Sequence, residues 1–255
     1  MTGTDSAGVP WEGRSFHAHE SAWGDDDGTP PPLLVEAIRR FRAQEVGEAE
    51  VADAVRAVRL LVPLVAELGA DGTAFDEHGR RIDKSQELSI VTVSAPDGRA
   101  ALPVFSSVAA MSAWNPGARP IPTPGPRVAL AAAGEGTDLV VLDPTGDTEF
   151  ALRRPALAAI ASGTPWTPAY LDPEVRAEFE RVAALEPDVA GVVVAPGDPL
   201  ARLAGPELAL FVGVRAGLDA VAVNALVARM QERWAPEIRA RIDSIGVRVE
   251  ADPRS

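Results

Sequence analysis

The chain has 255 residues, of which 46% are hydrophobic, and a formal net charge of −13. This length and apolar content predict one large or two modest folded domains and exclude disorder of the whole chain. The acidic composition disfavours nucleic acid and anionic membranes as partners, because neither gains counterion release from an acidic surface. The chain has no cysteine, which excludes disulfides, thiolate nucleophiles and cysteine-bound metals and fits a cytoplasmic protein.

Residues 1–30 predict a disordered acidic tail. They contain six acidic residues and one arginine, are rich in glycine and show no apolar period. Trp11, Phe16 and Trp23 offer an alternative, a short docking motif, but a tail without a fixed partner is the simpler expectation. The tail lacks the apolar core of a signal peptide, and no apolar run in the chain approaches the ~18 residues of a membrane span. We therefore expect no membrane association and a cytoplasmic location.

The next part of the chain predicts a helical hairpin followed by a strand. Apolar residues recur at helical spacing in residues 34–41 and again in residues 51–58, and Gly47 interrupts the pattern between them. The fully apolar run at residues 60–65 contains Pro63. Because proline cannot donate to a strand ladder, this run predicts an edge strand or a bulge.

A β-hairpin is the clearest local prediction. Pro96-Asp97-Gly98 predicts a tight turn, since glycine supplies a positive φ, between strands at residues 88–94 and 99–105. Further expected elements are a serine-capped helix at 107–114, an extended proline-rich segment at 119–126, a segment at 128–133 that fits a helix or a strand, strands at 139–143 and 148–152, and a helix at 155–162 that ends at Gly163.

The last third of the chain predicts a second small domain. Asp172 followed by proline and glutamate predicts a helix start, and Asp219 predicts the cap of a long helix. Strands are expected at residues 191–195, 209–214 and 247–250. The predicted fold class is α+β, with two small domains that each pack helices on a mixed or antiparallel sheet. The expected divisions are the tail at 1–30, a first domain at 31–168 and a second domain at 169–255.

Several short motifs in distinctive order resemble the SseB N-terminal domain, a family named for enhanced serine sensitivity. They are LVPL at 61–64, DGRAALPVFSS at 97–107, MSAW at 111–114, RP at 119–120, LDP at 142–144 and the ending Gly163, Trp166 and Pro168. The resemblance covers residues 55–168, and residues 170–252 are similar to the companion SseB C-terminal domain of actinobacteria. It implies a cytoplasmic α+β protein without an established activity, and it supplies no catalytic residues.

The residues themselves show no catalytic, cofactor or metal constellation. The chain lacks G-x-S-x-G, the phosphate-binding G-x-x-x-x-G-K-[ST] and a G-x-G-x-x-G after a strand. The histidines and their neighbouring acids fit a solvated tail or loop better than a metal site: His17, His19, His78, Asp76 and Asp83. Asp97, Asp143 and Asp147 are candidate carboxylates for acid–base chemistry, but all three lie in turns, where aspartate commonly bonds its own backbone.

Aromatic and arginine side chains near turns predict a binding surface, because such residues anchor interfaces. The candidate residues are Trp114, Asn115, Arg119, Arg127, Asp143 and Trp166. The alternative is that both tryptophans pack inward, which the helical spacing to Met111 favours for Trp114. Our leading hypothesis is a non-catalytic cytoplasmic adaptor with a protein partner or a homodimer. The alternative is an enzyme or an amino-acid-binding protein linked to serine metabolism, for which we identify no ligand.

Overall fold

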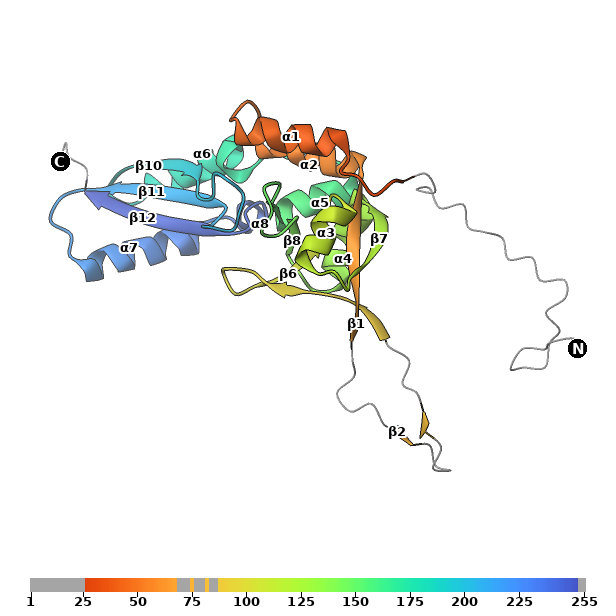
Figure 1. Cartoon of the computed structure of the whole chain (residues 1–255). Coiled ribbons are helices and arrows are strands. Elements are labelled where there is room, and N and C mark those ends of the chain that lie inside the picture. The colour runs from red at the N-terminus through yellow and green to blue at the C-terminus, as the bar shows by residue number, and fades with distance from the viewer. Residues whose placement is uncertain (1–25, 68–73, 76–80, 83–86, 252–255) are drawn as a thin grey trace, which may run out of the picture.

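The computed structural model describes residues 26–67, 74–75, 81–82 and 87–251, and side chains within these ranges except at 66–67, 74–75, 81–82 and 87–90. Most of the expected tail and the residues His17, His19, His78, Asp76 and Asp83 lie outside the described residues. We call residues 26–168 the first unit and residues 169–251 the second unit. Both combine helices with strands, so the predicted α+β class is confirmed (Figure 1).

The helices are α1 (Pro32–Arg42), α2 (Glu48–Ala57), α3 (Val108–Trp114), α4 (Gly125–Gly134), α5 (Arg154–Ser162), the 3₁₀ helix η1 (Ala169–Leu171), α6 (Pro173–Ala183), α7 (Ala220–Arg233) and α8 (Pro236–Ala240). The strands are β1 (Arg59–Glu67), β2 (Ala74–Phe75), β3 (Arg81–Ile82), β4 (Glu87–Ile90), β5 (Val93–Ser94), β6 (Ala100–Val104), β7 (Arg119–Pro124), β8 (Leu139–Leu142), β9 (Phe150–Arg153), β10 (Val189–Pro196), β11 (Leu208–Val214) and β12 (Ile245–Ala251).

Strand β1 lies in the middle of its sheet, so the predicted edge position is wrong. The order is β4-β1-β7, and the register to β7 is unbroken from Arg59 to Leu64, which excludes the predicted bulge as well. Leu61 exchanges two backbone hydrogen bonds with Phe105, and the ladder to β4 begins at Leu64. Pro63 lies between these two pairings. Its missing N–H therefore falls where β1 changes from one partner to the next.

Strand β7 contains three prolines at alternate positions, Pro120, Pro122 and Pro124. The N–H of Gly125 donates to the carbonyl of Val58 (3.0 Å), which places the residues between the prolines on the side facing β1. The proline nitrogens therefore point toward the other side of β7, where the described sheet ends and no ladder N–H is needed. The predicted extended conformation of this segment is confirmed.

Residues 26–29, which the sequence assigned to the tail, pack against the rest of the first unit. The guanidinium of Arg59 donates to the carboxylate of Asp26 (2.5 and 2.7 Å), and the N–H of Val108 donates to the carbonyl of Gly28 (3.0 Å). Arg59 is only 4% exposed, so burial strengthens this ion pair. The folded first unit therefore begins before residue 30.

Helices α1 and α2 form the predicted hairpin and share one hydrophobic core with α4, α5 and the strands of the first unit. The apolar faces are inward as expected, with Leu34 and Val51 fully buried. The segment at 128–133, ambiguous in the sequence, is helical within α4. The first residue of α4 is glycine because a Cβ at position 125 would lie 2.0 Å from the carbonyl oxygen of Val55.

The predicted turn at Pro96-Asp97-Gly98 is confirmed, with Gly98 at φ +84°. It joins β5 to β6 in a sheet of order β5-β6-β8-β9, in which β6 and β8 are parallel. The strand expected at 88–94 is two strands, since β4 pairs with β1 and β5 pairs with β6. One run of sequence thus links two sheets of the first unit.

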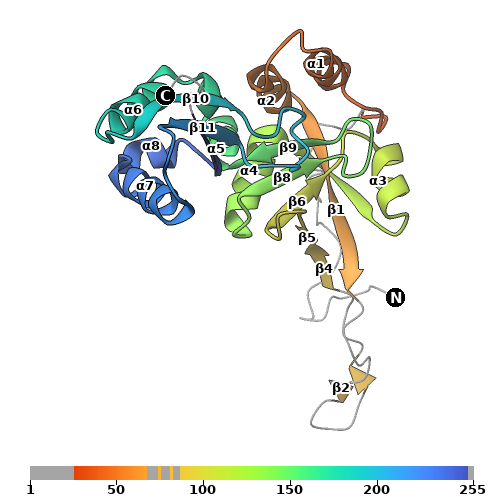
Figure 2. The same ribbon diagram turned by 90° about the vertical axis from the view of Figure 1, so that its left-hand side faces the viewer.

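The second unit packs its helices on the sheet β10-β11-β12. The carboxylate of Asp172 accepts from Glu174 N (2.8 Å) at the start of α6, and that of Asp219 accepts from Ala222 N (2.8 Å) at the start of α7. Both predicted caps are confirmed. Figure 2 shows the connection between β10 and β11 reaching from the second unit toward β9 of the first.

Candidate ligand site between the two units

The two predicted tryptophans pack inward, in different places. The Trp114 ring lies 5.2 Å from the Phe105 ring, against a small cluster with Leu61 and Met111. The Trp166 side chain packs against the main core of the first unit. They therefore do not form one exposed apolar patch.

The polar members of the predicted surface lie in different elements. The Asn115 side chain accepts a hydrogen bond from Gly117 N (2.9 Å) and so closes the turn after α3. Arg119 lies exposed at the start of β7, and Arg127 lies exposed on α4. Their role in binding stays a prediction.

Asp143 is buried and has a structural role in the first unit. Its carboxylate accepts hydrogen bonds from the N–H of Ser106 (2.8 Å), the hydroxyl of Ser106 (2.6 Å) and the hydroxyl of Thr148 (2.6 Å). These bonds tie the end of β6 to the loop between β8 and β9. Asp143 lies in a turn, as predicted, but its carboxylate bonds Ser106 and Thr148 and not its own backbone.

The two units meet around the buried guanidinium of Arg153, at the end of β9. It donates to the carboxylate of Asp198 (2.9 Å), the carboxylate of Asp243 (3.2 Å), the carbonyl of Gly205 (2.8 Å) and the hydroxyl of Ser244 (3.2 Å). All four acceptors belong to the second unit. A buried arginine with this many partners fixes their relative positions, because breaking any bond leaves a buried polar group unpaired.

A second arginine of the first unit, Arg99, strengthens this junction. It forms a bidentate pair with the Asp243 carboxylate (2.9 and 3.0 Å). Burial by itself would raise the pKa of Asp243, but hydrogen bonds and the positive charge of Arg99 outweigh it and hold the pKa below its ordinary value. Asp243 is therefore a carboxylate anion that two cations hold in place.

Residues 197–206, which connect β10 to β11, insert into the first unit. The N–H of Ala151 in β9 donates to the carbonyl of Ala201 (2.7 Å), and the Arg42 guanidinium donates to the carbonyl of Leu200. The side chain of Leu203 packs in a cluster with first-unit residues. The connection therefore adds its backbone to the edge of the first unit's sheet.

A cavity of about 230 Å³ lies where this connection meets the first unit. Its lining comes from the β5–β6 hairpin, β8, β9, the β8–β9 loop and the inserted connection: Val93, Ser94, Ala95, Pro96, Val141, Pro144, Thr145, Glu149, Ala151, Arg202 and Leu203. Most of these side chains are apolar, and Glu149 and Arg202 supply opposite charges. A concave, largely apolar space with few polar groups is the usual form of a small-molecule site.

Backbone strain concentrates at this cavity. Among the described residues, five residues other than glycine have positive φ, and four of them lie in its walls or directly beside them. They are Asp143 (+43°), Thr145 (+67°), Ala201 (+48°) and Leu203 (+57°). Such conformations cost free energy and cluster at ligand sites, where the surrounding structure holds them.

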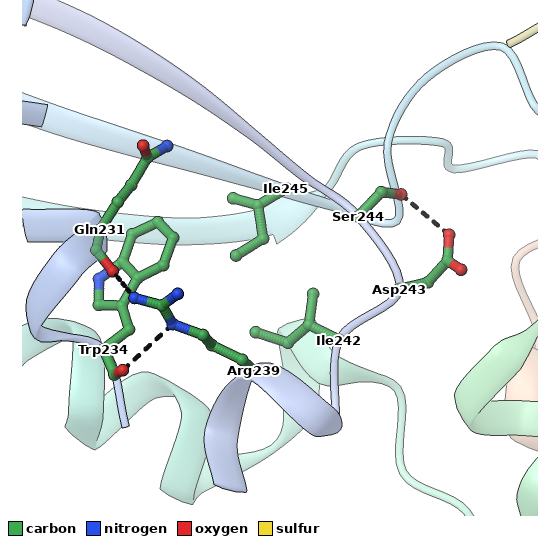
Figure 3. A pocket seen from close by; sticks show the side chains of 7 residues that line it. All are labelled: Gln231, Trp234, Arg239, Ile242, Asp243, Ser244 and Ile245. Atoms are coloured by element: carbon green, nitrogen blue, oxygen red, sulfur yellow. Dashed lines mark hydrogen bonds between the residues drawn. The ribbon is translucent and has the colours of Figure 1, made fainter. Parts of the chain in front are cut away.

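A second cavity, of about 280 Å³, lies in the second unit beside Asp243 (Figure 3). In it the Arg239 guanidinium donates to the carbonyls of Trp234 (3.2 Å) and Gln231, and the Ser244 hydroxyl donates to Asp243 (3.0 Å). Arg239 thereby caps the carboxyl end of α7. These polar groups already stabilise the fold, so we place the candidate ligand site in the first cavity.

The sequence analysis missed Arg153, Arg202 and Leu203. Each depends on contacts between residues far apart in the chain, which periodicity and local motifs do not show. The one local signal is the pair Gly197 and Gly205. A Cβ at position 197 would lie 2.3 Å from the carbonyl oxygen of Pro206, and a Cβ at position 205 would lie 2.4 Å from that of Gly197. This pair marks a tightly closed loop without indicating what it contacts.

Comparison with protein-family models finds the SseB protein N-terminal domain at residues 34–159. This part of the chain belongs to the SseB N-terminal domain family. The match begins before the expected residue 55, so α1 and α2 are part of the SseB domain. No curated protein and no solved structure matches the chain. The likeness of the second unit to an SseB C-terminal domain, and the actinobacterial source, stay predictions.

None of the helices in the described ranges combines the length and the apolar character needed to cross a membrane.

One buried acid at the junction of the SseB domain and the second unit has a strongly raised pKa. Burial raises the pKa of Glu48, the first residue of α2, to about 7, and the negative charge of Glu207 adds to the shift. The hydroxyl of Tyr170, in the second unit, donates to Glu48 (3.2 Å). Burial and the Glu48 charge raise the pKa of this phenol in turn.

We predict that Glu48→Gln stabilises the protein at high pH and not at low pH. The folded protein holds the Glu48 proton more tightly than the unfolded chain, so stability falls as pH rises from the ordinary pKa of 4.5 toward 7. Glutamine keeps the acceptor for Tyr170 and removes the ionisation. The free energy of unfolding from urea titrations should rise by about 2–3 kcal/mol at pH 8 and change little at pH 4.5.

The matched control is Glu237→Gln, at an exposed position of α8. It should have a small and constant effect over the same pH range. Equal effects of Glu48→Gln at pH 4.5 and pH 8 would contradict the burial of this carboxyl at the junction.

Proposed function

We propose that the protein is a non-catalytic binding protein of the SseB family whose ligand is a small molecule held in the cavity between its two units. The observation that carries this proposal is the composite wall of the cavity. Val93, Val141 and Ala151 come from the SseB domain, whereas Arg202 and Leu203 come from the inserted connection of the second unit. Because the site is built from both units, binding of the ligand would stabilise their association.

Binding rather than catalysis is proposed because the buried acid that the sequence singled out is already occupied. Three hydrogen bonds from Ser106 and Thr148 satisfy the Asp143 carboxylate. An acid or base of a reaction needs a lone pair or proton directed at the substrate. The cytoplasmic location and the link to serine metabolism remain expectations from the sequence and the family name.

We predict that filling the cavity abolishes the binding of a small neutral probe. Ala151 is 3% exposed and lines the cavity, so Ala151→Leu should fill part of its volume. Benzyl alcohol, added at millimolar concentration, should shift the methyl NMR signals of Val93 and Leu203 in the wild type and not in this variant. An apolar cavity of about 150 Å³ is enough to bind benzene, so the probe fits by size.

The matched control is Ala183→Leu, the same change at a buried position of α6 in the second unit. It should be destabilised by a similar amount, about 1–3 kcal/mol, and should still bind the probe. A wild type without probe-induced shifts at these methyl groups, or equal shifts in Ala151→Leu, would contradict the proposal.

A second candidate is the protein-binding adaptor role expected from the sequence, through a different surface. Val193 is 64% exposed in the middle of β10, and Phe211 is its neighbour on β11. The helices of the second unit pack against the alternating residues Val192 and Val194, on the opposite face of the sheet. This face therefore presents the exposed Val193 beside a half-buried Phe211, whose ring lies under the Arg248 guanidinium. Exposed apolar side chains of this kind occur at protein-docking faces.

For this second candidate we predict that Val193→Glu removes a specific partner that the wild type retains in quantitative affinity capture. The control is Val221→Glu on α7, whose valine is 77% exposed, and this variant should retain the partner. Reconstitution with the purified partner should then show at least a tenfold weaker affinity for Val193→Glu alone. Equal binding by both variants would exclude the sheet face as the docking surface.

A further inference from the structure

We infer that the ligand of the cavity is a small carboxylate with a compact apolar body, and that Arg202 binds its carboxylate group. This inference rests on the proposed function and adds the chemical class of the ligand. It follows from three features of the cavity, which are its floor, its size and the charges at its mouth.

The floor of the cavity selects an apolar body. Val141 and Ala151 lie side by side on β8 and β9, and Leu203 and Ala95 belong to the same buried cluster. Burying apolar ligand surface against these side chains contributes roughly 25 cal/mol per Å².

The size of the cavity selects a compact molecule. At about 230 Å³ it exceeds the volume of about 150 Å³ that accommodates a benzene molecule in an engineered protein cavity. One six-membered ring or a short branched chain therefore fits, together with a polar head group at the mouth. A long acyl chain or a nucleotide does not fit this volume.

Arg202 at the mouth provides a binding group for an anion. The Arg202 side chain is exposed, and its guanidinium reaches the carbonyls of Gly146 and Asp147 only at 3.5 and 3.4 Å. These contacts are at the outer limit of hydrogen bonding, so exchanging them for a carboxylate, which binds guanidinium in a bidentate pair, is favourable.

A second guanidinium, that of Arg42, lies near Arg202 but outside the cavity lining. It donates to the carbonyls of Glu149 and Leu200, and its Nε is buried without a hydrogen-bond partner among the described residues. Burial, and after it the nearby positive charge of Arg202, lower the pKa of Arg42. Two arginines thus lie close together, and a bound anion reduces their repulsion.

Two of the acids near these arginines form hydrogen bonds of their own, and neither bonds the side chain of Arg202. Glu149 accepts a hydrogen bond from the N–H of Thr145 (2.6 Å), which holds its carboxylate at the β8–β9 loop. Asp198 is buried and bonded to Arg153 and to the N–H of Leu203 (2.7 Å). Arg202 forms no ion pair with any described residue, and its charge remains available to the ligand.

The test compares three probes of one shape and different charge, which are benzoate, benzamide and benzylamine. Dissociation constants are measured by NMR titration of the full chain at constant ionic strength. Benzoate should bind the wild type at least tenfold more tightly than benzamide, and benzylamine should bind most weakly. In Arg202→Gln this advantage of benzoate should disappear, while the affinity for benzamide should stay within twofold.

Arg176→Gln is the matched control, because Arg176 is an exposed arginine on α6 outside the cavity lining. This variant should keep the full preference for benzoate. Equal binding of benzoate and benzamide by the wild type, or a preference that survives Arg202→Gln, would overturn the inference and leave the cavity as a site for neutral ligands. Failure of all three probes to bind would overturn the proposed function as well.

Discussion

The guanidinium of Arg153 is the interaction on which the junction of the two units depends. It lies at the end of a buried strand of the SseB domain and bonds four groups of the second unit. Two of its partners, Asp198 and Asp243, are themselves buried, so each charge needs the others to remain inside the protein. Removal of the cation would leave the buried Asp198 carboxylate without its ion-pair partner and the Asp243 carboxylate with Arg99 alone.

The inserted connection between β10 and β11 follows from this interaction. Asp198 begins the connection, and besides Arg153 its carboxylate accepts from the N–H of Leu203 and of Arg202. One side chain therefore shapes the loop and anchors it. The strained backbone of Ala201 and Leu203 persists because these contacts over-determine it. The candidate ligand cavity exists only where this loop covers the strands of the SseB domain.

Local structure was largely predictable from the sequence, because its causes are local. The helix caps Asp172 and Asp219, the turn at Gly98 and the end of α5 at Gly163 each follow from one residue type at one position. The position of β1 was not predictable. Whether Pro63 excludes a central strand depends on the partner opposite its nitrogen, and that partner is set by the tertiary fold.

The candidate site was not predictable from the sequence for a similar reason. The predicted surface joined Trp114, Asn115 and Arg119 because they are near one another in the chain. In the structure Trp114 packs inward and Asn115 closes a turn, whereas Arg119 is exposed. Arg153 and Asp198 are 45 residues apart, and no pattern in the sequence connects them. The turn context of Asp143 is visible in the sequence, whereas its bonds to Ser106, 37 residues away, are not.

A double-mutant cycle between Arg153 and Asp198 tests the central claim most directly. Arg153→Met, Asp198→Asn and the double variant are compared with the wild type by urea unfolding at pH 7. If this buried pair joins the two units, the double variant should be more stable than the sum of the single effects predicts, with a coupling free energy of about 2 kcal/mol or more. Effects that add to within about 0.5 kcal/mol would show that the two groups act independently and would contradict this account of the junction.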